Sequence, residues 1–317
     1  MRIQRIIGIA LAGITLAAAA GCGSDNTLES QGGSTTGSGD KGSVTVGGQD
    51  FTESRILAAI YQKLLEGDGY SVTTKLVTTR DVYIPELSKG SVDIVPDYLA
   101  GITDYLNTDE NGADAPLVSS NDPAATLAAL KPLAEQKGIS ILPPSDATDQ
   151  NAFFVTQKFA DDNNLTTLSD LAGLGQPIKL AAPADCEGRA DCEGGLKDVY
   201  GIDITSIVPL EFGSAQMKEA VKSGEVQMGE TGTTDGTLAD AGFVLLEDDK
   251  GIQPAQNLTP AVNADFLKAN PDLTQLFDKL SAALTTDDLA TMNAKVDVER
   301  QKPEDVAAQF LSDKGLV

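Results

Sequence analysis

The stretch SVTVGGQDFTESRILAAIYQKLLEG, residues 43–67, predicts a β-strand followed by an α-helix. Its first residues alternate polar and apolar side chains, which is typical of a half-buried strand. Apolar residues then recur at Ile56, Ile60 and Leu64, the spacing of one buried helix face. Thr52 stands where a helix N-cap is expected, and glycines follow where the helix is expected to end. A strand that leads into a helix is the repeating unit of an α/β sheet.

The rest of the chain continues this alternation of short strands and helices. Further strand-like runs occur at 70–78, 92–95, 139–142, 153–155, 178–180, 207–208, 226–228, 243–246 and 261–262. Helix patterns at 271–284, 287–297 and 303–314 have no second sheet of their own to cover, so we expect them to pack on the first block. The pattern therefore predicts an α/β chain with largely parallel sheets and two lobes. The first lobe is 44–146 plus 252–317, and the second, inserted lobe is 147–251. A ligand cleft is expected between the lobes.

The N-terminus has the pattern of a lipoprotein signal peptide. Basic residues precede an apolar run of 15 residues, Ile6–Ala20, which is too short for a spanning helix. The run ends in Ala-Ala-Gly-Cys22, which resembles a bacterial lipobox, so Cys22 is the predicted lipidation site. An ordinary signal peptide with a chance cysteine is the alternative. Residues 1–21 are then removed, 22–43 form the lipidated Cys and a flexible Gly/Ser linker, and the protein is extracytoplasmic and lipid-anchored to the cell membrane.

Composition excludes several classes of function. The 317 residues carry 47 Asp and Glu against 23 Lys and Arg, a net charge of −24, which argues against nucleic acid as a partner. There is no His, which excludes Ser-His-Asp triads and His-ligated metals. An exported enzyme would need paired carboxylates, and no pair stands out. The GSGDKG run at 37–42 follows a linker rather than a strand, so it does not predict a dinucleotide site. We expect no metal and no cofactor.

Two further groups of residues have structural interpretations. Cys186 and Cys192 lie in a Gly-rich stretch of an exported chain, which favours a disulfide over a metal site, since two thiolates do not complete a zinc shell. The acidic residues between Asp104 and Asp114 lack the spacing of an EF-hand and are interpreted as a solvated loop.

Four segments, in order, resemble motifs of the ProX/OpuC-type osmoprotectant-binding proteins of ABC transporters. They are VGGQDFTES (46–54), IPELSKGSVDIVPDY (84–98), GGLKDVYG (194–201) and TTDG (233–236). The likeness runs from about Val44 to the C-terminus. It implies a two-lobed, periplasmic-binding-protein-like (type II) fold and the solute-binding subunit of an importer, not an enzyme. The implied partners are a small-molecule solute and separate permease and ATPase chains, and the chain itself is expected to be a monomer.

The resemblance also implies a ligand class and a set of contacts. Family members capture glycine betaine, choline or carnitine in a box of tyrosines, because a quaternary ammonium donates no hydrogen bonds and is attracted by ring faces. Tyr98 and Phe153 fall on two of the four box positions, and the other two fall at Glu193 and Gly232. The remaining candidate contacts are Tyr83, which could compensate for a lost ring, Gln49, Thr52, Asn151, Thr231, Asp235, and Arg80, which could clamp a carboxylate or pair with Asp81.

The incomplete aromatic box leaves other interpretations open. One is a binding protein of the same fold and transport role with a non-quaternary ligand, such as a polyol, a sugar or an aromatic compound. Another is a lipoprotein with a scaffolding role only.

Overall fold

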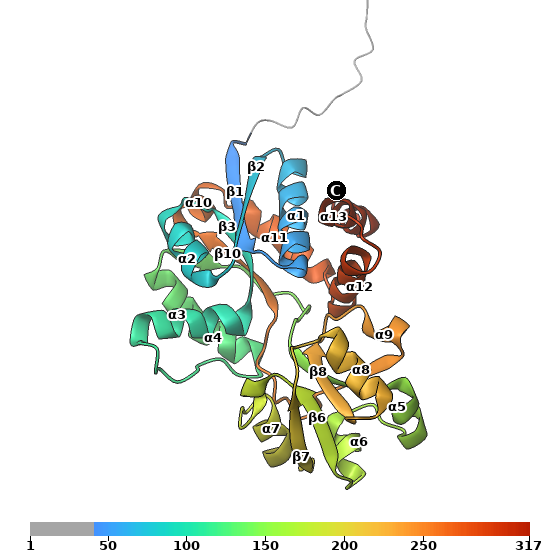
Figure 1. The fold of residues 1–317 in the computed structure, drawn as a ribbon. Coiled ribbons are helices and arrows are strands. Elements are labelled where there is room, and N and C mark those ends of the chain that lie inside the picture. The colour runs from blue at the N-terminus through green and yellow to red at the C-terminus, as the bar shows by residue number, and fades with distance from the viewer. Residues whose placement is uncertain (1–40) are drawn as a thin grey trace, which may run out of the picture. The chain divides into compact units, whose positions relative to one another are not determined.

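The computed structural model describes residues 41–317, which belong to one compact unit with two five-stranded sheets (Figure 1). The first sheet has the order β2-β1-β3-β10-β4, with β1 (Ser43–Gln49), β2 (Ser71–Val77), β3 (Ile94–Tyr98), β4 (Ile139–Ile141) and β10 (Leu258–Asn263). The second has the order β7-β6-β8-β5-β9, with β5 (Asn151–Thr156), β6 (Ile178–Ala182), β7 (Ile204–Pro209), β8 (Met228–Gly232) and β9 (Phe243–Leu246). The predictions for the signal peptide, Cys22 and most of the linker lie outside the described residues.

Helices surround each sheet, so the predicted α/β class is confirmed (Figure 1). Around the first sheet lie α1 (Thr52–Gly67), α2 (Arg80–Lys89), α3 (Leu99–Asn111), α4 (Pro123–Gln136), α10 (Ala264–Ala269), α11 (Leu273–Ala283), α12 (Thr286–Asp297) and α13 (Pro303–Asp313). Around the second lie α5 (Gln157–Asn163), α6 (Leu168–Gly173), α7 (Glu193–Asp198), α8 (Ala215–Ser223) and α9 (Leu238–Ala241), with a short 3₁₀ turn at Ala184–Cys186. No helix within residues 41–317 is both long enough and apolar enough to cross a membrane.

Each sheet contains one strand that runs against its neighbours. Strand β5 is antiparallel to β8 and β9, and β10 is antiparallel to β3 and β4. Both are the first strand after the chain passes from one sheet to the other, so each enters its sheet from the side of the other lobe. The other strands of each sheet are parallel, as the alternating pattern predicts.

The core of the first lobe joins the N-terminal and C-terminal ends of the described chain. The predicted face of α1 is buried, with Ile56, Ile60 and Leu64 each at most 2% exposed. Phe277 of α11 and Phe310 of α13 belong to the same apolar cluster. Burial of side chains of this size contributes roughly 2 kcal/mol each, so contacts from the distant helices hold α1 against the sheet.

Two local predictions are wrong. The N-cap of α1 is Phe51, which makes no side-chain cap bond, and Thr52 is the first helical residue. In the acidic run 104–114, all of the acidic residues but Asp114 lie on α3 rather than in a loop. Ile102 and Leu106 are fully buried at helical spacing and fix the inner face of that helix. On α3 the carboxylate of Asp104 accepts hydrogen bonds from Ser119 rather than from solvent alone.

The two segments that connect the lobes run side by side. The backbone N–H of Asp149 donates to the carbonyl of Gln256 at 3.1 Å, and the Gln150 side chain donates to the carbonyl of Pro254 at 2.8 Å. A β-bridge pairs Thr148 with Asn257. These bonds couple the two segments into one connecting strap.

Candidate ligand-binding cleft

A cavity of about 770 Å³ lies between the two lobes. From the first lobe it is lined by the start of α1 and by α12, and from the second by the end of β8 and the segment that follows β7. The lining includes residues of both lobes and of the connecting strap. They are Phe51, Thr52, Glu53, Asn293 and Asp297 of the first lobe, Glu211, Phe212, Lys218, Thr231, Thr234 and Asp235 of the second, and Asp149 of the strap. Strand ends and lobe boundaries meet here, which is where small-molecule sites form in open α/β folds.

Glu53 is the most buried carboxylate that lines this cavity. The side chain is 3% exposed, and Tyr98 donates its phenolic O–H to Glu53 Oε1. Asn293 Nδ2 donates to Glu53 Oε2 at 2.7 Å and to the carbonyl of Thr234 at 3.1 Å. Burial raises the pKa of Glu53, and the bonds from Tyr98 and Asn293 oppose that rise. Asn293 therefore connects the first lobe to the second beside the carboxylate.

Asp149 is the second carboxylate of this group and lies on the connecting strap. Thr234 Oγ1 donates to Asp149 Oδ1 at 3.1 Å. Burial raises the pKa of Asp149 to about 7, and the charge of Glu53 adds to the rise. None of the ion pairs within residues 41–317 includes Glu53 or Asp149. The two acids thus face a shared cavity without a protein cation to neutralise them.

On the wall of the cavity formed by the second lobe, the charge of Asp235 is neutralised by Lys218. Asp235 pairs with Lys218 at 2.6 Å and also accepts hydrogen bonds from Thr231 Oγ1 at 2.7 Å and from Thr237 Oγ1 at 2.6 Å. Burial acts to raise the pKa of Asp235, but Lys218 and the two threonines outweigh it and lower the pKa. Thr231 and Asp235, both predicted contacts, therefore line the cavity as a closed polar cluster.

Thr52, the other predicted contact in this cavity, is not the N-cap of α1. Its hydroxyl donates to Asp297 Oδ1 at 2.8 Å, which links the start of α1 to the end of α12. Gln49 is the last residue of β1, and its side chain donates to the carbonyl of Thr78 at 3.4 Å. Gln49 does not line the cavity.

Arg80 and Tyr83 converge on one buried carboxylate instead of a ligand. Arg80 Nη2 lies 2.7 Å from Asp97 Oδ1, and the hydroxyl of Tyr83 donates to Asp97 Oδ2. The backbone N–H of Tyr98 donates to Asp97 Oδ1 at 2.7 Å. Asp97 is 1% exposed, so this is a buried ion pair. The sequence predicts two alternative partners for Arg80: the carboxylate of a ligand, or Asp81. In the structure the guanidinium pairs instead with Asp97 of the same lobe.

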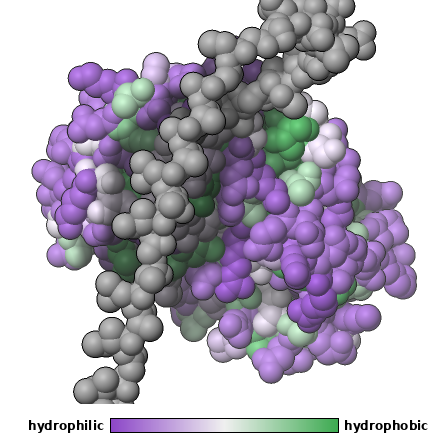
Figure 2. Space-filling model, turned by 90° about the horizontal axis from the view of Figure 1, so that it is seen from above, coloured by the Kyte–Doolittle hydropathy of each residue, from purple (hydrophilic) through white to green (hydrophobic). Residues whose placement is uncertain are grey.

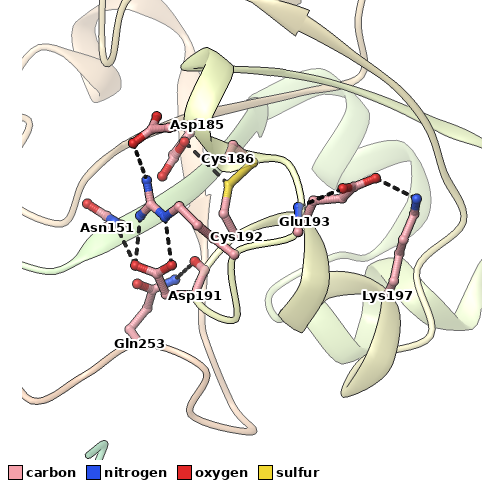
Figure 3. Close-up of a disulfide and its surroundings, with 11 residues drawn as sticks. Asn151, Asp185, Cys186, Asp191, Cys192, Glu193, Lys197 and Gln253 are labelled. Carbon is pink, nitrogen blue, oxygen red and sulfur yellow. Dashed lines mark hydrogen bonds and ion pairs between the residues drawn. A yellow bond between two sulfur atoms is a disulfide. The ribbon is translucent and has the colours of Figure 1, made fainter. Parts of the chain in front are cut away.

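The disulfide Cys186–Cys192 closes a small loop in the second lobe (Figure 3). Asp191 in this loop pairs with Arg189 at 2.7 Å and accepts a bond from Asn151 Nδ2 at 3.4 Å. Glu193 points away from Asn151 and Asp191, towards Lys197 (Figure 3). The loop therefore holds both side chains: Asn151 through Asp191, and Glu193 through the backbone N–H of Gly188, which donates to Glu193 Oε2 at 3.0 Å. Glu193 also pairs with Lys197 outside the loop.

Near the disulfide, Glu230 is a buried carboxyl, and burial raises its pKa to about 7 against the attraction of Arg189. Cys186, Cys192 and Glu230 lie close enough together to resemble a metal-binding group. The sulfurs of Cys186 and Cys192 are bonded to each other, so neither is available as a thiolate ligand for a metal. Phe153 lies opposite Glu230 in the β5–β8 pair and is 1% exposed, as part of the core of the second lobe.

Sequence reasoning missed most of the residues that line the cavity, among them Phe51, Glu53, Asp149, Phe212 and Asn293. Phe51 lies inside the motif that carries the family likeness, but nothing in the pattern showed that its ring is exposed. Asp149 and Asn293 lie in segments that the pattern assigns to a connection and to a helix. The packing of α12 on α1 brings Asn293 to Glu53, and the course of the connecting strap brings Asp149 to the same cavity.

Comparisons with known proteins agree with this architecture. Residues 42–313 match the family described as the substrate binding domain of ABC-type glycine betaine transport systems. A glycine-betaine-binding protein of Pseudomonas aeruginosa is 29% identical over 86% of this chain and 88% of its own length. The carnitine transport binding protein OpuCC of Listeria monocytogenes is 27% identical over 87% of this chain and 88% of its own length. The structure of apo YehZ from Escherichia coli superposes with a TM-score of 0.74 at 29% identity, covering 86% of this chain and 99% of that one.

These findings confirm the type II fold and the family predicted from the four motifs. The named relatives are transport binding proteins, and proteins of this family act outside the cytoplasm with a small-molecule ligand and a permease. Because the match covers nearly all of the described residues, the chain belongs to the family of substrate-binding domains of ABC-type glycine betaine transport systems and is the solute-binding component of such a transporter.

Proposed function

We propose that this chain captures a quaternary-amine osmoprotectant of the glycine betaine, choline and carnitine class in the cleft between its lobes and delivers it to its permease. The observation that carries the proposal is the pair Glu53 and Asp149, a buried and a half-buried carboxylate in one cavity, neither of which forms an ion pair within residues 41–317. A quaternary ammonium would supply the missing positive charge. The names of the relatives, which bind glycine betaine or carnitine, support the same ligand class.

Capture requires the lobes to close over the solute. We propose that lobe I is 44–146 plus 252–317, that lobe II is 147–251, and that they rotate about the crossings at 146–150 and 250–255. Support comes from the side-by-side connecting segments, which form the covalent links between the sheets. Hinge closure of this kind buries a solute without chemical change, so the protein would bind and release its ligand and catalyse no reaction.

Attachment to the membrane belongs to the same proposal. Cys22 would carry the lipid after residues 1–21 are removed, and the linker would let a monomeric domain reach its permease. Mass spectrometry of the membrane-extracted protein tests this, since a diacylated N-terminal Cys22 supports it and an unmodified chain contradicts it.

Isothermal titration calorimetry tests the ligand class. The chain from Cys22 onward, with Cys22→Ser, is titrated with glycine betaine, choline and carnitine, and with trehalose and proline as controls. We expect micromolar binding of at least one quaternary amine and no change in the recovered solute. Binding of trehalose alone would replace the proposal with a non-quaternary ligand, and consumption of a solute would indicate an enzyme.

A further inference from the structure

Two large aromatic side chains stand exposed on facing walls of the inter-lobe cavity. Phe51, at the N-cap of α1, is 39% exposed, and Phe212, after β7, is 43% exposed. Where the described surface is visible in Figure 2, hydrophilic residues predominate. A single exposed apolar residue needs no explanation, but two in one ligand cavity, from opposite lobes, indicate a surface that something covers.

Most charged side chains that line this cavity are acidic. Its acidic side chains are Glu53, Asp149, Glu211, Asp235 and Asp297, and its basic side chain is Lys218. Lys218 is already engaged by Asp235 and by the hydroxyl of Thr237. Arg80 and Arg189, which do not line the cavity, are paired with Asp97 and Asp191. A solute carboxylate in this cavity would therefore meet acids and, among residues 41–317, no unpaired cation.

The rings that the family likeness places in the ligand box are not available as open faces. Tyr98 is 7% exposed and Phe153 is 1% exposed, and neither lines this cavity. The cavity thus combines exposed ring faces at Phe51 and Phe212 with unneutralised carboxylates at Glu53 and Asp149. Ring faces and carboxylates together are the chemistry that recognises a cation unable to donate hydrogen bonds.

We propose that the closed cleft holds the onium group of a net cationic solute between Phe51 and Phe212, with its charge balanced by Glu53 and Asp149. This deepens the proposed function, on which it rests, by naming the charge class: a choline-like cation is preferred to a zwitterion such as glycine betaine. Closure brings the two rings together because they belong to different lobes, so the solute itself links the walls.

Titration calorimetry with three probes tests the charge class. The probes are choline, glycine betaine and 3,3-dimethylbutan-1-ol, the neutral isostere of choline. We expect choline to bind at least about 10-fold more tightly than glycine betaine, and the isostere to bind at least about 100-fold more weakly than choline, because it lacks both the ring attraction and the carboxylate attraction. Equal or tighter binding of glycine betaine, or binding of the isostere within a few-fold of choline, overturns the proposal.

Variants test the two rings. Phe51→Leu and Phe212→Leu keep an apolar side chain but remove the ring, and each should weaken choline by about 3- to 30-fold. Phe212→Tyr should retain binding. Phe159→Leu, a partly buried ring outside this cavity, is the matched control and should leave choline affinity unchanged.

The outcomes separate this inference from the proposed function. If choline or glycine betaine binds and both Leu variants bind it as tightly as the parent chain, the ring proposal fails while the transport proposal stands. If no quaternary amine binds, both fail. Circular dichroism shows whether each Leu variant has folded. If one has not, the test relies on Phe212→Tyr, because a site that depends on the ring still binds choline when Phe212 is replaced by Tyr.

Discussion

The phenolic hydroxyl of Tyr98 donates a hydrogen bond to the carboxylate of Glu53, which joins the end of β3 to the first turn of α1. The sequence likeness assigns this tyrosine to the wall of a ligand box. In the structure it lies behind a carboxylate that lines the cavity, and its ring is 7% exposed. Tyr98 therefore orients and stabilises the charge that faces the solute.

Tyr98→Phe keeps the ring and removes only the donor to Glu53. We expect a loss of about 1–3 kcal/mol of unfolding free energy, because the acceptor is a buried carboxylate. We also expect the pH midpoint of choline binding to rise, since Glu53 loses a bond that lowers its pKa. Tyr70→Phe, which loses a bond to Asn270 far from the cavity, should lower stability without moving that midpoint. Denaturant unfolding and calorimetry across pH measure both effects, and an unchanged midpoint in Tyr98→Phe would contradict this role.

The raised pKa of Asp149 predicts opposite pH trends for stability and for binding. Between its ordinary pKa near 4 and about 7, the folded protein holds a proton that the unfolded chain has released, so the stability of the unliganded protein should fall as pH rises through this window. A cationic solute favours the charged carboxylate, so choline affinity should rise with pH, by up to about 10-fold per unit below pH 7.

Asp149→Asn provides the check on that assignment. Glu53, Glu211, Asp235 and Asp297 also line the cavity, but Asp235 is held ionised by Lys218. We expect the Asn variant to bind choline more weakly at pH 8 and to lose the part of the pH dependence between 5.5 and 8 that Asp149 contributes, while the part contributed by Glu53 remains. Calorimetry at several pH values measures this, and a full pH dependence in the variant would assign the titration to another group.

Asp97→Asn tests the buried centre that holds Arg80, Tyr83 and the Tyr98 backbone. Removing one partner leaves the guanidinium without its counter-charge, so the free energy of unfolding should fall by about 3–5 kcal/mol. Asp162→Asn breaks the exposed pair between Asp162 and Lys158, whose side chains are 59% and 82% exposed, and should lower stability far less than Asp97→Asn does. Urea denaturation of the two variants side by side would refute the argument if their losses were equal.

Gly236→Ala tests the contact between α12 and the segment after β8. A Cβ at this position would lie 2.1 Å from the carbonyl oxygen of Ala290, so backbone has to shift. We expect a loss of about 1–3 kcal/mol in unfolding free energy. Gly173→Ala is the matched control, because nothing lies within 4 Å of its added Cβ, and it should be neutral or slightly stabilising. Thermal melts compare the two, and a neutral Gly236→Ala would show that this contact is loose.

Much of the fold follows from local sequence patterns. The apolar spacing of 43–67 predicts the first strand and the buried face of α1, because side-chain periodicity is a property of the backbone geometry itself. The four motifs predict the family, which the comparisons confirm. The exception at α3 is instructive: its acidic surface residues obscured the buried spacing of Ile102 and Leu106. Local pattern thus determined the elements, their order and the class of protein.

The contacts of the cleft were decided by the tertiary structure. Arg80 pairs with Asp97 rather than with its neighbour Asp81. Tyr98 donates to Glu53, and Thr234 donates to Asp149. Each of these contacts joins different elements of the fold rather than residues on one helix face. Periodicity states which side of an element is buried but not which distant element covers it. Whether a ring is an open face, as at Phe51, or a core residue, as at Phe153, depends on that partner. The sequence by itself determined a two-lobed solute-binding protein, and only the packing of the lobes and α12 decided which charges and rings face the solute, because burial and pKa are set by neighbours that lie far away along the chain.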